Sequence, residues 1–174
     1  IVLDAVADAF LDQFKSAMAG FKHGDPMEQG TTLAPLSSAD ALDKLEKQVQ
    51  TAVQHGAKLL LGGKRVLDTK GNFMEPTILT DIAENNPMFS EEFFGPVAMF
   101  FRVPDEDAAV ALANNSPFGL GGSVFTKDVE RGRSVARRID TGMVFVNSAA
   151  VSLPDLPFGG VKNSGYGREL SALG

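Results

Sequence analysis

The sequence of 174 residues contains no cysteine, a single tyrosine and only two histidines, His23 and His55. The absence of cysteine excludes disulfide bonds, thiolate metal ligands and a cysteine nucleophile within this chain. The two histidines lie where a loop and a helix end are predicted, so we expect them to be solvated and to bind no metal. Catalysis by histidine therefore has few candidates.

Basic residues are in the minority, because 16 Lys and Arg stand against 22 Asp and Glu and give a net charge of −6. No run of Lys or Arg occurs, which argues against nucleic acid or an anionic membrane as the partner. No apolar run approaches the ~20 residues needed to span a bilayer. The chain starts at Ile1 with no visible targeting signal, so we expect a cytoplasmic chain cut from a longer protein.

The composition, 44 % hydrophobic and 22 % charged, is typical of a globular protein, and the length suits one domain. Apolar residues repeat at helical spacing over 2–21, 37–56, 105–113 and 129–139, and the arginines of the last helix are expected to be solvated. Short apolar runs predict buried strands over 57–61 and 97–103, and further strands are predicted over 76–82, 121–125 and 143–146. Strands and helices alternate from residue 97 onward, which predicts parallel pairing through right-handed crossovers. The predicted fold is α/β, an open, mostly parallel sheet with helices on both faces.

The last part of the chain, 148–174, has no regular period and is rich in proline and glycine. Ligands of open parallel sheets bind beyond the carboxyl ends of the strands. A long loop that follows a strand ending at Asn147 is therefore well placed to line a pocket. Residues 157–169 of this loop contain several glycines, but Lys162-Asn163-Ser164 does not match the arrangement of a Walker phosphate loop.

A second segment that could carry chemistry is Glu91-Glu92-Phe93-Phe94-Gly95-Pro96, just before a predicted strand. One interpretation is the start of a strand, with solvated glutamates and buried phenylalanines. The other is a ligand site, in which a carboxylate accepts hydrogen bonds from the hydroxyls of a ribose while an aromatic ring packs on the ligand.

Four segments together resemble the NAD(P)-dependent aldehyde dehydrogenase superfamily. They are Glu92-Phe93-Phe94-Gly95-Pro96-Val97, Ala113-Asn114-Asn115-Ser116-Pro117-Phe118-Gly119-Leu120, Gly142-Met143-Val144-Phe145-Val146-Asn147 and Pro157-Phe158-Gly159-Gly160 through Gly167-Arg168-Glu169. They occur in the order and spacing of the family, and the resemblance covers essentially the whole chain. Phe118 stands where the family usually has tyrosine.

The resemblance implies that residues 1–174 are the C-terminal part of the catalytic domain, with 148–174 as the substrate-pocket loop and tail. The reactive cysteine and most of the cofactor domain would lie upstream of Ile1. No catalytic residue is therefore expected in this chain, and the isolated chain is expected to be inactive. The cofactor of the intact enzyme would be NAD or NADP. The implied partners are a small aldehyde, the remainder of the enzyme and further copies in a homo-oligomer.

By resemblance, Glu92 corresponds to the glutamate that binds the nicotinamide-ribose hydroxyls, and Phe94 to the aromatic residue that contacts the nicotinamide. Phe158 corresponds to a ring of the aldehyde pocket, the alternative being a core aromatic that holds its loop. Ser152 resembles the serine that succinate-semialdehyde dehydrogenases place against the substrate carboxylate, the alternative being an ordinary loop serine. Lys162 and its neighbours are expected to brace their loop.

In this family a thiolate adds to the aldehyde, the hemithioacetal transfers hydride to the nicotinamide, and water hydrolyses the thioester. The segments resemble the bacterial succinate-semialdehyde type most, so the predicted reaction is the oxidation of succinate semialdehyde to succinate. One alternative is a non-catalytic interaction or dimerisation module with the same fold. Another is an aldehyde dehydrogenase for a different substrate, such as betaine aldehyde.

Overall fold

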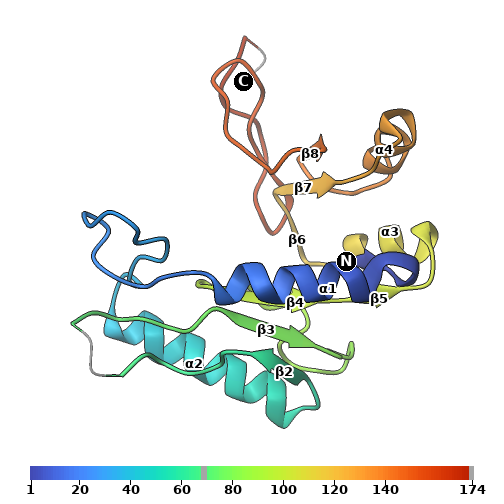
Figure 1. The fold of residues 1–174 in the computed structure, drawn as a ribbon. Helices are drawn as coiled ribbons and strands as arrows, with labels where there is room; N and C mark the ends of the chain where they lie inside the picture. The colour runs from blue at the N-terminus through green and yellow to red at the C-terminus, as the bar shows by residue number, and fades with distance from the viewer. Residues whose placement is uncertain (68–69, 173–174) are drawn as a thin grey trace. The chain divides into compact units, whose positions relative to one another are not determined.

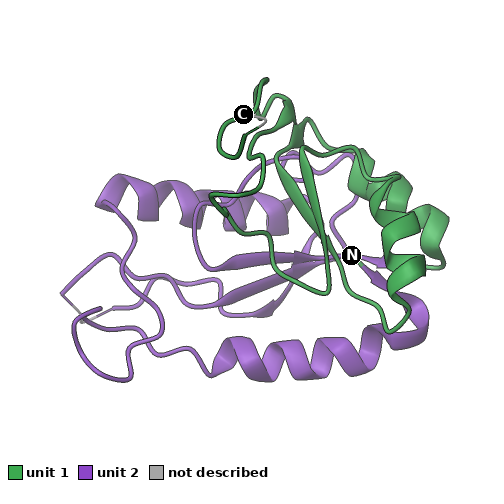
Figure 2. Ribbon diagram, turned by 90° about the horizontal axis from the view of Figure 1, so that it is seen from above, with its two compact units in different colours: residues 1, 103–174 green, residues 2–102 purple. Residues whose placement is uncertain are grey.

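The structure, a computed structural model, describes residues 1–67 and 70–172. The described chain groups into two compact units, which are described separately below (Figure 2). Unit 1 comprises Ile1 and Val103–Gly174, and unit 2 comprises Val2–Arg102. The elements follow in the order β1 (Val2–Leu3), α1 (Asp4–Ala19), α2 (Ala39–Gln54), β2 (Lys58–Leu61), β3 (Thr77–Thr80), β4 (Val97–Phe100), β5 (Arg102–Val103), α3 (Glu106–Asn114), β6 (Phe118–Gly119), β7 (Gly121–Val124), α4 (Val129–Ala136), β8 (Met143–Val146) and β9 (Val161–Lys162).

Unit 2 is a three-layer arrangement in which α1 and α2 cover opposite faces of the sheet β2-β3-β4 (Figure 1). β3 and β4 are parallel, with Ile78 opposite Ala98 and Leu79 opposite Met99. Successive side chains of a strand point to opposite faces. Ile78 therefore packs with Ala7 and Met18 of α1, whereas Leu79 belongs to the cluster formed with α2. All four residues of β3 are buried, as expected of the central strand of a sheet that is covered on both faces.

The helix α2 has both ends set by residues close to it in sequence. The Ser38 hydroxyl accepts a hydrogen bond from the amide of Ala41 at 3.1 Å and caps the first turn. Gly56 follows the last turn with φ of +101°, a conformation that glycine adopts without steric cost. The helix predicted over 37–56 is confirmed as Ala39–Gln54, with Ser38 before its first turn and Gly56 after its last.

Two strands of unit 2 differ from the predictions. β2 was expected to be buried, yet Lys58 and Leu59 are exposed because β2 is the outer, antiparallel strand of its sheet. The Lys58 ammonium lies 2.7 Å from the Asp81 carboxylate, and this hydrogen bond lowers the pKa of Asp81. The predicted strand 97–103 is divided into β4 and β5, and between them the Phe101 carbonyl accepts a hydrogen bond from the amide of Val2.

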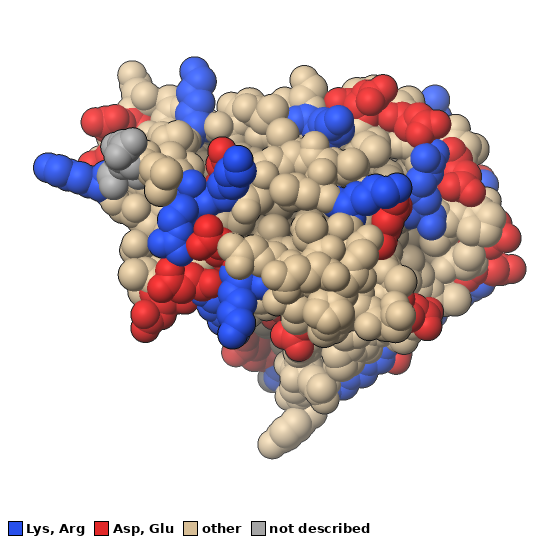
Figure 3. Space-filling view, turned by 90° about the horizontal axis from the view of Figure 1, so that it is seen from below, with Lys and Arg blue, Asp and Glu red and all other residues tan. Residues whose placement is uncertain are grey.

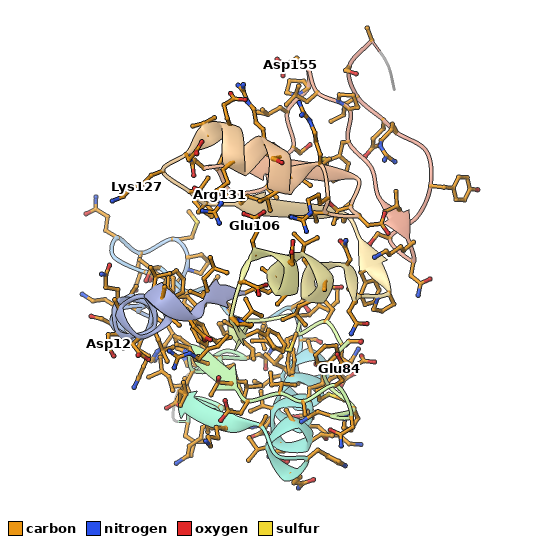
Figure 4. The ribbon with its side chains drawn as sticks, turned by 90° about the vertical axis from the view of Figure 1, so that its right-hand side faces the viewer. Asp12, Glu84, Glu106, Lys127, Arg131 and Asp155 are labelled. Carbon is orange, nitrogen blue, oxygen red and sulfur yellow. The ribbon has the colours of Figure 1, made fainter. Side chains whose placement is uncertain are left out.

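In unit 1, β7 and β8 form a parallel pair with Gly121 opposite Met143 and Val124 opposite Val146. Ion pairs at the surface join α3 to α4 and to the residues that follow α4. The carboxylate of Glu106 accepts a hydrogen bond from Arg131 at 2.7 Å (Figure 4). It accepts another from Arg138 at 3.0 Å. Arg131 and Arg138 are nevertheless exposed, as are Arg133 and Arg137, so the expected solvated face is confirmed. The hydrogen bond with Glu106 raises the pKa of Arg131.

The predicted α/β class is confirmed, with parallel pairing at β3–β4 and β7–β8. The strands of residues 1–67 and 70–172 are divided among several small sheets, however, rather than joined in one open sheet. Which strands pair depends on long-range register, which local periodicity does not encode. No helix in this part of the chain is long and apolar enough to cross a membrane.

Candidate functional site

The loop of residues 91–96 in unit 2 presents one carboxylate and one aromatic ring to solvent. Phe93 packs against the core cluster beside α2, whereas Phe94 is 70 % exposed and Glu92 is exposed. The two sequence interpretations thus each describe part of the loop, because Phe93 is half-buried against the core whereas Phe94 is exposed. An exposed carboxylate next to an exposed ring on a fixed loop suits a ligand with hydroxyl groups and a flat ring.

The backbone of this loop is anchored to α2 on its inner side. The side-chain amide of Gln48, only 9 % exposed, donates a hydrogen bond to the Glu92 carbonyl oxygen at 3.3 Å. Gly95 lies directly against α2, since a methyl group on it would be 2.3 Å from Cδ2 of Leu45. Gln48 was not predicted, although an amide within the apolar stripe of a helix is the signal that could have identified it.

The loop that contains Ser152 starts from a strained residue in unit 1. Asn147 follows β8 with φ of +56°, a conformation to which Asn is better suited than most residues. Its side-chain amide pairs with the backbone of Thr126, accepting from the amide at 2.8 Å and donating to the carbonyl at 2.8 Å. Asn147 thus continues the β7–β8 pairing with its side chain and has a structural role.

Ser152 lies in an exposed stretch after this residue. Among the residues that the structure describes, its hydroxyl has no hydrogen-bond partner, so the hydroxyl is available to a ligand. Ser148 differs, because its hydroxyl donates to the Ala149 carbonyl oxygen at 3.2 Å. The backbone of the stretch is held by a hydrogen bond from the amide of Ser171 to the Pro154 carbonyl oxygen at 3.0 Å.

Phe158 is half-buried and starts a glycine-rich segment that is packed tightly on the beginning of β8. A methyl group on Gly142 would lie only 1.8 Å from the Gly159 carbonyl oxygen and 2.9 Å from Cα of Gly160. The two backbones approach each other so closely that a side chain at position 142 has no space. The lack of a side chain at Gly142 therefore helps to fix the position of Phe158. This role of Gly142 was not predicted from the sequence.

The four predicted site residues are divided evenly between the units. Glu92 and Phe94 share one loop of unit 2, whereas Ser152 and Phe158 belong to unit 1. No group of three or more His, Asp or Glu that could hold a metal ion occurs within residues 1–67 and 70–172. On the face drawn in Figure 3, acidic and basic side chains lie next to one another. Arg65 forms ion pairs with Asp43 and Glu46.

A family model described as the aldehyde dehydrogenase family matches residues 1–174. The chain belongs to the aldehyde dehydrogenase family. All four segments on which the resemblance rested lie inside this match, so the recognition made from the sequence is confirmed. The candidate residues are thus residues of an aldehyde dehydrogenase chain.

Three individual relatives show which kinds of aldehyde dehydrogenase the chain is similar to. The chain is 49 % identical over 174 residues to succinate-semialdehyde dehydrogenase [NADP(+)] of Deinococcus radiodurans, covering all of this chain and 36 % of that protein. Among solved structures, succinic semialdehyde dehydrogenase from Streptococcus pyogenes in complex with NADP+ has a TM-score of 0.96 and 46 % identity, over 99 % of this chain and 38 % of that one. Betaine aldehyde dehydrogenase from Staphylococcus aureus in complex with NAD+ has a TM-score of 0.93 and 32 % identity, over 99 % and 35 %. The aldehyde dehydrogenase chain therefore spans a little over a third of the length of these relatives.

Proposed function

We propose that this chain is part of an aldehyde dehydrogenase that oxidises succinate semialdehyde to succinate with NADP+ or NAD+. The observation that carries the proposal is the 49 % identity, over the whole chain, to an NADP-dependent succinate-semialdehyde dehydrogenase. Water supplies the added oxygen, and the cofactor takes two electrons and a proton as hydride. The chain contains no cysteine, so the thiolate of this mechanism must come from another part of the enzyme.

On the cofactor side, Glu92 and Phe94 fit a nicotinamide ribose. The exposed Glu92 carboxylate has two acceptor oxygens and no donor, which matches two adjacent ribose hydroxyls. The exposed Phe94 ring offers an apolar face to the nicotinamide. When bound, the nicotinamide accepts the hydride of the oxidised aldehyde. The two residues of this chain orient that ring, and Gln48 holds their loop.

Replacing Glu92 by glutamine in the intact enzyme is expected to raise the KM for NADP+ about tenfold, because one acceptor oxygen becomes an N–H donor. The KM for the aldehyde should change less than about twofold. Steady-state kinetics with each substrate varied in turn measures both values.

Glu91→Gln is the matched control for Glu92→Gln, because Glu91 is an exposed neighbour on the same loop and carries the same charge. It is expected to leave both KM values unchanged. If the two variants behave alike, the assignment of Glu92 to the ribose is wrong.

On the aldehyde side, Ser152 and Phe158 are proposed to contact the substrate. The Ser152 hydroxyl is free among the described residues and can donate a hydrogen bond to a carboxylate, a charge-assisted contact that is stronger than a neutral one. The half-buried Phe158 ring would form an apolar wall beside the aldehyde chain. Succinate semialdehyde has a carboxylate at the end remote from its aldehyde, whereas betaine aldehyde has a cation there.

Ser152→Ala in the intact enzyme is expected to lower kcat/KM for succinate semialdehyde by about tenfold, the equivalent of one charge-assisted hydrogen bond. A neutral aldehyde of similar length should lose less than about twofold. Ser148→Ala serves as the control, because the Ser148 hydroxyl is bonded within its own loop. The isolated 174-residue chain provides the blank. Equal losses on both aldehydes would contradict the Ser152 assignment.

A betaine-aldehyde dehydrogenase is the second candidate, favoured by the Staphylococcus aureus structure at 32 % identity. The two candidates predict opposite preferences, so kcat/KM of the intact enzyme for each aldehyde separates them. A cytoplasmic homo-oligomer, in which this chain binds the remainder of its enzyme, stays a prediction from the family resemblance.

A further inference from the structure

Residues 158–169, here called the closed loop, are fastened at their base by Phe158 itself. The Phe158 amide donates to the Glu169 carbonyl oxygen at 2.8 Å, and the Glu169 amide donates to the Phe158 carbonyl oxygen at 2.8 Å. The Arg168 guanidinium also donates to the Gly160 carbonyl oxygen at 2.9 Å. The backbone of Phe158 is thus part of the closed loop, and its orientation follows that of the loop as a whole.

Lys162, at the far end of the closed loop, reaches the end of α3. Its ammonium lies 2.9 Å from the carbonyl oxygen of Asn114 and 3.3 Å from the Asp140 carboxylate. Asn114 is the last residue of α3, and the last turn of that helix contains no basic residue. Carbonyl groups at a helix C-terminus lack donors and carry the negative end of the helix dipole. Lys162 therefore supplies, from 48 positions away, the cation that α3 lacks.

The two acceptors of the Lys162 ammonium belong to Asn114 and Asp140, and these two residues are hydrogen-bonded to each other. The Asn114 side chain donates to the Arg138 carbonyl oxygen at 2.8 Å and accepts from the Asp140 amide at 2.7 Å. Asn114 thereby fixes the turn that carries the Asp140 carboxylate. The ammonium of Lys162, whose side chain is only 23 % exposed, ties the closed loop to Asn114 and this turn through charge-assisted contacts.

The backbone at Lys162 indicates that its side chain matters. Its φ is +55°, a left-handed conformation that is costly for a residue with a side chain and free for glycine. The pairing of β6 with β9 and the hydrogen bond from the Gly119 amide to the Ser164 hydroxyl hold the backbone in this conformation. Strain of this kind persists where the surrounding contacts require the residue. Here the contact that glycine would lose is the one with Asn114 and Asp140.

We propose that Lys162 is a positioning residue for the aldehyde side of the site, and that its ammonium sets the closed loop that carries Phe158. Lys162 itself contacts neither the aldehyde nor the cofactor. The inference rests on the proposed function, because the role of Phe158 in the aldehyde pocket belongs to it. Loss of the ammonium should weaken aldehyde recognition and spare cofactor binding, since the Glu92 loop is anchored to α2 in unit 2.

Three variants of the intact enzyme test the role of the ammonium. Lys162→Met keeps the length of the side chain without its charge, Lys162→Gly also removes the backbone strain, and Lys162→Arg keeps the charge. The Met and Gly variants are expected to raise the KM for succinate semialdehyde about tenfold by misplacing Phe158, with the KM for NADP+ within about twofold. Lys162→Arg should recover most of the loss. Lys127→Met, at an exposed lysine of the same unit, should change neither value.

Hydrogen exchange measured by mass spectrometry gives a readout that does not depend on activity. Peptides from residues 158–169 and the amide of Gly119 should exchange faster in Lys162→Met and Lys162→Gly, whereas β7 and β8 should keep their protection. Unchanged exchange in the closed loop, equal increases of both KM values, or an Arg variant as impaired as the Met variant would overturn the proposal. Failure of the proposed function would instead appear as a wild-type enzyme inactive on succinate semialdehyde, and the exchange result would then decide on Lys162 alone.

Discussion

Replacing Gly142 by alanine is expected to lower the free energy of unfolding by about 3 kcal/mol, the upper range for overpacking a close-packed site. The new methyl group would lie 1.8 Å from the Gly159 carbonyl oxygen, 2.7 Å from its carbonyl carbon and 2.9 Å from Cα of Gly160. All three atoms belong to backbone, so no side-chain rotation relieves the clash. The start of β8 and the closed loop must separate.

Gly122→Ala is the matched control, because it also adds a methyl group to a glycine of the β7–β8 sheet. That methyl group would lie 3.8 Å from Ile139 and from Thr141, which is ordinary van der Waals distance. Its effect should stay within about 1 kcal/mol, and it could be slightly stabilising because the unfolded chain loses freedom. Denaturant unfolding of both variants of the intact enzyme measures the difference. Equal midpoints would contradict the close packing of Gly142 against Gly159.

The pair Gly95 and Leu45 is expected to show strong non-additivity in a double-mutant cycle. Leu45 is 1 % exposed, and truncating it to alanine should cost about 2–5 kcal/mol by opening a cavity. Gly95→Ala alone should cost about 1–3 kcal/mol, since its methyl group would lie 2.3 Å from Cδ2 of Leu45. In the double variant the methyl group occupies part of the cavity, so the total cost should fall short of the sum by about 1 kcal/mol or more.

The control cycle combines Gly95→Ala with Ile78→Ala, whose side chain belongs to the cluster on the opposite face of the sheet. These two changes should add within about 0.5 kcal/mol. Gly95 lies in the same loop, residues 91–96, as Glu92. The KM for NADP+ of each variant therefore shows whether the packing beneath this loop also positions Glu92 for cofactor binding. An additive result for Gly95 and Leu45 would contradict their contact. It would mean that the loop accommodates the added methyl group by moving its own backbone, whether or not the Leu45 side chain is present.

Local signals in the sequence were sufficient for much of the secondary structure. The strand predicted over 143–146 is confirmed as Met143–Val146, and the helix predicted over 37–56 is confirmed as Ala39–Gln54 with a Ser38 cap. These features depend on residues adjacent in sequence, as capping and β-periodicity do. The boundaries that differed, such as the division of 97–103 into two strands, depend on hydrogen bonds to distant segments.

The candidate site was predicted unevenly for the same reason. Glu92, Phe94, Ser152 and Phe158 were selected because their segments resemble the family, and their functional roles stay predictions. Of the residues proposed to support them, Gln48 was not predicted, and Lys162 was predicted only to brace its loop. Gln48 acts on a residue 44 positions away, and Lys162 acts on one 48 positions away. Such contacts leave no periodic trace in a single sequence.

The amino-acid sequence alone was enough to establish the family, the α/β class and the absence of a thiol nucleophile from this chain, because motifs, periodicity and composition are properties of the linear chain. Only the tertiary structure showed that Phe94 is exposed while Phe93 packs half-buried against the core, that Gly142 leaves room for another backbone, and that Lys162 contacts the C-terminal end of α3. Burial, close backbone approach and charge pairing arise between segments far apart in sequence, and they exist only after the chain has folded.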